Sequence, residues 1–168
     1  GSPNETDTRK PIPVRLLQID VAVKDDRATK TGWVFGTFVY GGGPGGKAGN
    51  GWTHVEPIGV MWGNDPKFTG SGPLKETILN PDVRMPHLGY QGRLNGPVDN
   101  KASSCLSCHA TAEVRHVDEM VPPNGVDPRR WFENIPSGTP FDAGRKSTDY
   151  SLQLAVGIAN FEKIDPAA

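Results

Sequence analysis

The chain lacks both a long hydrophobic run and an excess of charge of either sign. No stretch reaches the roughly 18 consecutive apolar residues of a membrane-spanning helix, so no membrane span is expected. Lys and Arg number 18 against 19 Asp and Glu, which gives a net charge of −1. Neither the basic footprint of a nucleic-acid-binding protein nor a polybasic membrane patch is present. These absences argue against nucleic acid and membrane surfaces as partners.

Cysteine is scarce too, and the position of the two cysteines leads to the functional hypothesis. Cys105 and Cys108 are the only ones in the chain, and His109 follows at once. The pattern C-x-x-C-H is typical of covalent haem c attachment. Two thiols on one helical turn can reach vinyl groups at one porphyrin edge, and the adjacent imidazole can ligate iron. In this motif the chain resembles c-type cytochromes, which implies one haem c, covalent through Cys105 and Cys108, with His109 as iron ligand.

Three other interpretations of the cysteines remain. A Cys-x-x-Cys redox pair would lie near a βαβ pattern, which the sequence does not have. A zinc site could combine both cysteines with His109 and His116, but that histidine spacing is not a zinc-finger spacing and no second cysteine pair exists. A disulfide between Cys105 and Cys108 is sterically poor at so short a separation. Haem c attachment is the favoured hypothesis.

The abundance of glycine and proline, 21 and 16 residues, predicts a turn-rich protein of short strands. Residues 1–10 are expected to be a flexible tail or linker, and residues 11–168 a single β-rich domain. The predicted fold is mainly β, a β-sandwich-like framework with an embedded, partly helical and proline-rich haem-binding segment at about 93–146. Strands are expected near 14–23, 32–40, 52–62, 74–79 and 151–158.

Details of these elements follow from side-chain patterns. Alternation puts Leu17, Ile19, Val21 and Val23 on one face, which predicts a half-buried first strand. Apolar residues on both faces of 32–40 predict a central strand, and Pro57 predicts an edge or a bulge in the third. A helix over 101–114 is expected with Ser103 or Ser104 as N-cap, and a short one from Pro128 after an Asp127 cap. Alternating apolar residues predict that 151–158 pairs with the early strands.

The second axial ligand of the iron is open in the sequence. No methionine follows Met120, and the motif lies past the middle of the chain, unlike the ordinary helical cytochromes c. His87, in an irregular loop, ranks first. Met120 ranks second, followed by Met61 and Met85, and then by an open site. His116 lies two helical turns after His109, on the same face, and is expected to be a surface residue.

Further residues are candidates because of the implied cofactor. Haem propionates need cationic partners, for which Arg93, Arg129 and Arg130 are available. Trp131 and Phe132 could lie over the ring edge and exclude water. For each of them, surface charge or ordinary packing is the competing role.

The leading functional prediction is a bacterial monohaem c-type cytochrome that passes single electrons between redox partner proteins. Haem c is attached outside the cytoplasm in bacteria, as the resemblance implies, so a periplasmic or extracellular location is expected, with a leader or anchor removed. No catalytic acid–base constellation is visible, so an electron carrier is favoured over an enzyme. The alternative is a haem enzyme or gas-binding protein with an open distal site, similar to cytochrome P460 and the β-rich cytochromes c′. A third hypothesis is a docking module of a larger assembly.

Overall fold

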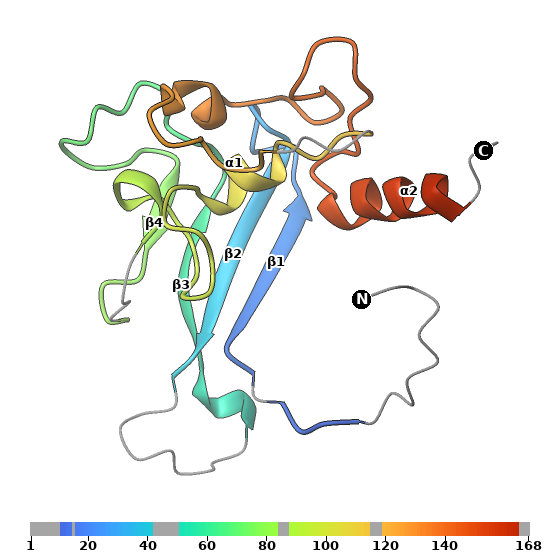
Figure 1. Cartoon of the computed structure of the whole chain (residues 1–168). Coiled ribbons are helices and arrows are strands. Elements are labelled where there is room, and N and C mark those ends of the chain that lie inside the picture. Colours follow the sequence, from blue (N-terminus) through green and yellow to red (C-terminus); the bar gives the residue numbers. More distant parts are fainter. Residues whose placement is uncertain (1–10, 15, 42–50, 84–87, 115–118, 165–168) are drawn as a thin grey trace.

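The computed structural model describes residues 11–14, 16–41, 51–83, 88–114 and 119–164, which are built around one antiparallel sheet (Figure 1). Each strand pairs with the next one along the chain. The strands are β1 (Gln18–Lys24), β2 (Trp33–Tyr40), β3 (Val55–Met61) and β4 (Thr77–Leu79). β2 is central, as predicted, and the register shifts opposite Pro57, where a bulge was one expectation. The mainly β class is confirmed, whereas the described residues contain no second sheet that would complete a sandwich.

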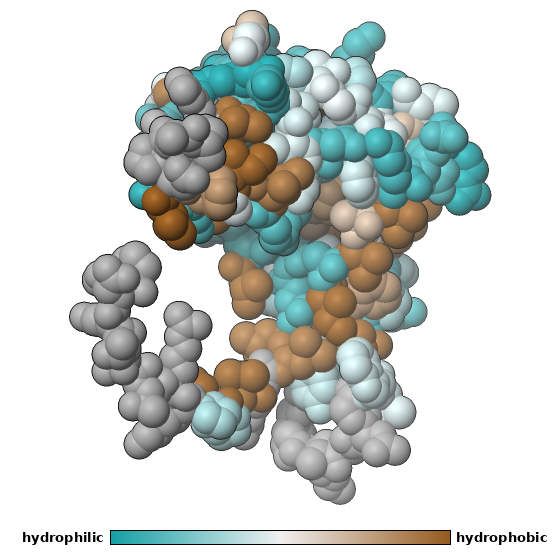
Figure 2. Space-filling view, turned by 90° about the vertical axis from the view of Figure 1, so that its right-hand side faces the viewer, coloured by the Kyte–Doolittle hydropathy of each residue, from teal (hydrophilic) through white to brown (hydrophobic). Residues whose placement is uncertain are grey.

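The two faces of the sheet differ in what covers them. Phe35, Ile58 and Met61 form the buried side with residues of later segments, among them Leu94 and Tyr150 of the loops and Leu106 of the helix that carries the cysteines. On the other side Val21 and Val23 are 43% and 51% exposed, and Val60 and Ile78 are exposed beside them. Figure 2 shows apolar surface on the side of the molecule that carries β1. The predicted burial of the apolar face of β1 is therefore wrong: Asp20 and Ala22 on the other face are exposed too, and only Gln18 and Ile19 of the strand are half-buried.

The helices are short, except for the last. They are η1 (Gly51–His54), η2 (Tyr90–Gly92), α1 (Cys105–His109), η3 (Pro128–Phe132) and α2 (Leu152–Ile164). α1 lies over the sheet in front of β2 (Figure 1) and covers only the middle of the predicted 101–114 helix. The short helix from Pro128 is confirmed as a 3₁₀ turn capped by Asp127. None of the helices in the described residues combines the length and apolarity needed to cross a bilayer.

Residues 152–158 are helical, so the strand predicted over 151–158 is wrong. Apolar residues at every second position also create pairs four residues apart, and such a short pattern fits both periods. The Ser151 hydroxyl accepts a hydrogen bond from the Leu154 amide at 3.2 Å, in the manner of a helix N-cap. Ala, Leu, Glu and Lys, all good helix formers, continue the segment to Ile164. α2 buries only Ala155 and does not join the sheet.

Candidate functional site

Helix α1 carries the C-x-x-C-H motif, and two serines fix its first turn. The Ser104 hydroxyl accepts from the Ser107 amide at 3.0 Å, and the Ser107 hydroxyl accepts from the Ser104 amide at 2.7 Å. This capping box satisfies donors that the start of a helix leaves unpaired. The Ser104 hydroxyl also donates to Asn64 Oδ1 at 2.8 Å, which ties the turn to the loop after β3. The motif side chains therefore extend from one well-anchored turn.

Cys105 joins this turn to the centre of the sheet. Its Sγ lies 3.3 Å from Oγ1 of Thr37 in β2, and its amide donates to the Leu94 carbonyl at 3.1 Å. The next residue, Leu106, is fully buried in the core. Packing on the sheet thus determines which way Cys105 and its neighbours on the turn can point.

A cavity of about 480 Å³ opens beside α1. Cys105, Cys108 and His109 all border it, together with Phe35 of β2 and Asp20 of β1. Loop residues complete its wall: Asn95, Asp99, Asn100, Ser103, Glu119, Met120, Val121 and Pro123. The volume falls in the range of roughly 300–1,000 Å³ that is usual for small-molecule and cofactor sites. All three side chains of the motif share one space of cofactor size.

His109 is held in the orientation and tautomer of a metal ligand. Its Nδ1 lies 2.8 Å from the carbonyl oxygen of Tyr150. A carbonyl can only accept, so in the neutral imidazole the proton lies on Nδ1 and Nε2 keeps its lone pair. Metal-ligating histidines are commonly oriented by such a carbonyl. The Phe35 ring, 4.9 Å away between centroids, packs against the imidazole and limits its rotation.

Two successive residues in left-handed conformation aim the Tyr150 carbonyl. Asp149 and Tyr150 have φ values of 51° and 66°, which are uncommon outside glycine and cost of order 1–3 kcal/mol each. Asp149 stabilises the turn through its carboxylate, which accepts from Lys24 Nζ, Ser137 Oγ, Trp33 Nε1 and Gly138 N at distances of 2.7–3.1 Å. The buried Tyr150 donates its hydroxyl to the Ile135 carbonyl at 2.6 Å. Desolvation raises the pKa of Asp149, but these hydrogen bonds outweigh it and lower the pKa to about 2.

Asp149→Ala is expected to lower the free energy of unfolding by about 1–2 kcal/mol, because it removes a charged acceptor from several donors. The pKa of Asp149 is lower in the folded chain than its unfolded value of about 3.9. Its contribution is therefore complete above about pH 4 and is lost as the pH falls towards 2. Urea unfolding across this range measures both effects. The exposed Asp26→Ala is the control, and an equal loss in both variants would contradict the role of Asp149.

The two thiols are protonated at neutral pH. Burial raises the pKa of Cys105 to about 12, against a lowering hydrogen bond from Thr37, and burial raises the pKa of Cys108 to about 11. Zinc binding and thiol–disulfide exchange both use the thiolate. The two cysteines are free thiols, with no disulfide between them. The raised pKa values of both thiols weigh against a reactive redox pair, whose attacking thiol usually has a lowered pKa.

Two carboxylates lie beside Cys105, at the β1 side of the cavity. Ligand atoms of Asp20, Asp99 and Cys105 lie within 4.8 Å of one another. The Gln18 amide donates to Asp20 at 2.6 Å and to Asp99 at 2.9 Å, and so bridges β1 to the loop before α1. A Cβ at Gly96 would lie 1.9 Å from the Gln18 side chain, so this bridge requires glycine there. The carboxylates serve as acceptors in a structural contact.

Trp131 acts on the cavity wall indirectly, through the segment that carries Met120. Its Nε1 donates to the Glu119 carbonyl at 3.2 Å, and its ring is buried. Met120 follows Glu119 and borders the cavity, where it remains 38% exposed. From the sequence, Trp131 was a candidate to lie over the edge of the implied haem ring. In the structure it is not among the residues that line the cavity, and instead holds the backbone next to Met120.

Arg93 and Phe132 lie away from the cavity, in a separate buried cluster. The Arg93 guanidinium donates to the carbonyls of Asn64, Asp65 and Tyr90 at 2.6–3.1 Å. It stacks on Phe132 at 4.6 Å, and Phe132 in turn stacks on Tyr90. Burial lowers the pKa of Arg93, while nearby Asp65 raises it. Arg93 is only 2% exposed, and besides these carbonyls its guanidinium donates to the Gln91 side-chain oxygen at 3.2 Å.

The remaining candidates from the sequence are dispersed. Arg129 pairs with Asp127 and Arg130 with Asp142, and neither borders the cavity beside α1. Met61 is completely buried in the core on β3, where packing is its role. The predictions for His87, Met85 and His116 fall outside the described residues. Of the suggested second ligands, Met120 is the one that the described residues bring to the cavity with His109.

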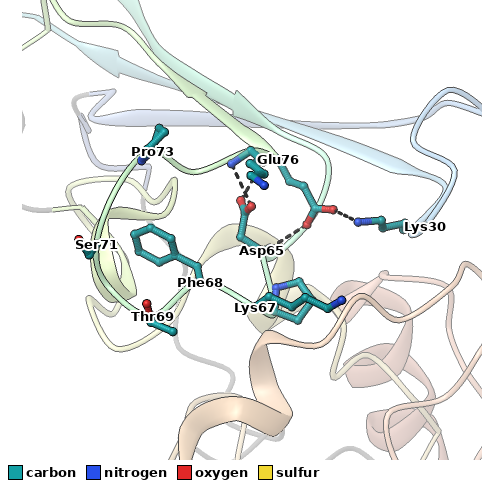
Figure 3. A pocket seen from close by; sticks show the side chains of 10 residues that line it. Lys30, Asp65, Lys67, Phe68, Thr69, Ser71, Pro73 and Glu76 are labelled. Carbon is teal, nitrogen blue, oxygen red and sulfur yellow. Dashed lines mark hydrogen bonds and ion pairs between the residues drawn. The ribbon is translucent and has the colours of Figure 1, made fainter.

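A second cavity, of about 450 Å³, lies between the loops that join β3 to β4 and β1 to β2 (Figure 3). At its inner side Asp65 accepts from the amides of Lys75 and Glu76, both at 2.9 Å, and Glu76 accepts from the Asp65 amide at 2.8 Å. Lys30 reaches Glu76 at 2.6 Å. We call these reciprocal hydrogen bonds between Asp65 and Glu76 the carboxylate–amide clasp. Both acids help to close the β3–β4 loop.

Comparison with known proteins gives no relative: no family model, no curated protein and no solved structure matches the chain. The site must therefore be interpreted from its own residues. Sequence reasoning missed Thr37, Asp149 and Tyr150. Tyr150 acts through a backbone carbonyl, which leaves no mark in a residue pattern, and the contacts of Thr37 and Asp149 depend on tertiary packing.

Proposed function

We propose that the protein is a monohaem c-type cytochrome that carries single electrons between partner proteins outside the cytoplasm. One observation carries the proposal: the two thiols and the imidazole of C-x-x-C-H border one cavity of about 480 Å³, with His109 Nδ1 held by a backbone carbonyl. We further propose residues 93–146 as the haem-binding segment of the β framework. Bound there, haem c would supply a one-electron ferric/ferrous couple.

The residues around the cavity match the demands of this group. The thiols of Cys105 and Cys108 would each add S–H across one vinyl double bond, so that sulfur bonds to one carbon, the hydrogen goes to the other, and no oxidant or leaving group is needed. His109 offers Nε2 to the iron, and the Tyr150 carbonyl keeps the ring from turning. Phe35 supplies an apolar wall that excludes water.

Export of the chain in a bacterium with haem c attachment machinery is expected to give protein whose mass exceeds the polypeptide by one haem. The haem should survive denaturation and organic extraction, and a redox titration should follow a one-electron curve. The Cys105→Ala/Cys108→Ala double variant should fold and carry no covalent haem, with circular dichroism as the control for folding. A folded wild-type chain that passes through the same machinery without haem would refute the proposal.

A further inference from the structure

We infer that Met120 supplies the second axial ligand of the iron, through its thioether sulfur. The inference rests on the proposed function, because it concerns the same cavity. Met120 and His109 border that cavity together with both cysteines. Met120 is 38% exposed, although a methionine of a folded chain is usually packed against other apolar side chains. An accessible thioether thus shares a space with an imidazole whose Nε2 is available.

The competing donors at the cavity are less suited to this position. Asp20 accepts a hydrogen bond from Gln18, and the two cysteines are committed to attachment. The Glu119 backbone carbonyl accepts the hydrogen bond from Trp131. The Glu119 side chain is a carboxylate, which is a hard ligand, whereas haem iron in electron carriers takes imidazole and thioether ligands. Met61, the other described methionine, is fully buried in the core. Met120 is the soft donor among the described residues that line this cavity.

The backbone around Met120 is held in a way that suits a ligand. Trp131 Nε1 fixes the Glu119 carbonyl on one side at 3.2 Å. Val121-Pro122-Pro123 follows on the other, and the two prolines restrict the backbone. Trp131 belongs to η3, which is capped by Asp127 and packs against α1. Met120 and His109 are therefore connected through η3 and α1, and Trp131 is the positioning residue for Met120.

The inference is tested by spectroscopy of the haem-loaded protein and its variants. The ferric wild type is expected to be low-spin and to show the weak long-wavelength charge-transfer band of iron–thioether ligation. Met120→Ala should lose this band, and its ferrous form should bind carbon monoxide readily. Met120→His should restore a low-spin spectrum without the band. The matched controls His87→Ala and Met85→Ala remove the alternative ligands and should keep the band.

Two further measurements keep the inference testable if Met120→Ala fails to accumulate. With methyl-labelled methionine, one of the three methyl signals of the ferrous wild type should be strongly shifted by the porphyrin ring current. Met85→Leu should leave that signal in place. Trp131→Phe keeps an aromatic ring but removes the donor to Glu119, and should lose the charge-transfer band at a lower temperature than the wild type while haem stays attached.

The outcomes separate the inference from the proposed function. A wild type without covalent haem refutes the proposed function. Attached haem with no thioether band, or a band that persists in Met120→Ala, overturns Met120 and leaves the cytochrome proposal standing. Loss of the low-spin spectrum in His87→Ala would assign the position to His87 instead.

Discussion

Arg93→Met is expected to lower the free energy of unfolding by about 3–5 kcal/mol, because it leaves buried carbonyl oxygens without their donor. Arg93 serves three carbonyls, those of Asn64, Asp65 and Tyr90, and each loses a charge-assisted hydrogen bond. The substitution also removes the cation from the face of Phe132. Methionine restores apolar volume but none of the donors, so packing does not offset the loss.

Urea unfolding of Arg93→Met, with Arg129→Met as the matched control, measures the effect. The Arg129 side chain is 82% exposed and pairs with the neighbouring Asp127, so its replacement should change the free energy of unfolding by less than about 0.5 kcal/mol. The free energy of unfolding of Arg93→Lys should lie between the values of these two variants. A lysine ammonium cannot donate to the same separated acceptors as a planar guanidinium. Equal stability of Arg93→Met and the wild type would contradict this account of the loop cluster.

Glu76→Ala is the second large effect, with an expected loss of about 2–4 kcal/mol at neutral pH. Glu76 is buried, and it accepts hydrogen bonds from the Asp65 amide, from Asn134 and from Lys30. Its removal leaves the Asp65 amide unpaired and opens the carboxylate–amide clasp. Figure 3 shows Glu76 between Asp65 and Lys30, with dashed lines to both.

Glu76 also makes the free energy of unfolding depend on pH under acidic conditions. Desolvation raises the pKa of Glu76, but hydrogen bonds from Asn134, Lys30 and the Asp65 amide outweigh it, so the folded pKa is lowered. The stabilisation is therefore complete above the unfolded pKa of about 4.3 and is lost as the pH falls through the lower folded value. Unfolding of Glu76→Ala should depend less on pH in this range than that of the wild type. The exposed Glu162→Ala should retain the wild-type dependence.

Local signals in the sequence predicted local structure well. The helix cap expected at Ser103 or Ser104, the short helix from Pro128 and the edge or bulge expected at Pro57 all follow from side-chain chemistry within a few residues, and the structure has Ser104 as the cap and a register shift at Pro57. The burial of β1 and the structure of 151–158 could not be predicted in this way. Which face of a strand is buried depends on where later segments pack, and a short alternating run fits a helix as well as a strand.

The same contrast between local signals and long-range packing applies to the candidate site. The motif Cys105, Cys108 and His109 is contiguous in sequence, so its residues had to lie together. Arg93 was a candidate for its charge alone, and its place in a loop cluster depends on carbonyls of distant residues. Trp131 was suggested as a neighbour of the cofactor, but in the structure its indole donates to the Glu119 backbone carbonyl. Long-range contacts of this kind have no sequence pattern within one chain.

The hydrogen bond between His109 and Tyr150 has a consequence for the order of biosynthesis. The acceptor lies 41 residues after the imidazole it orients, so the ribosome completes the C-x-x-C-H motif well before the turn that holds its histidine. A chain cut between the two would keep every residue of C-x-x-C-H and lose the alignment of its histidine. The C-terminal part of the protein, which contains none of the motif, is therefore the last part needed to orient the His109 imidazole at the cavity.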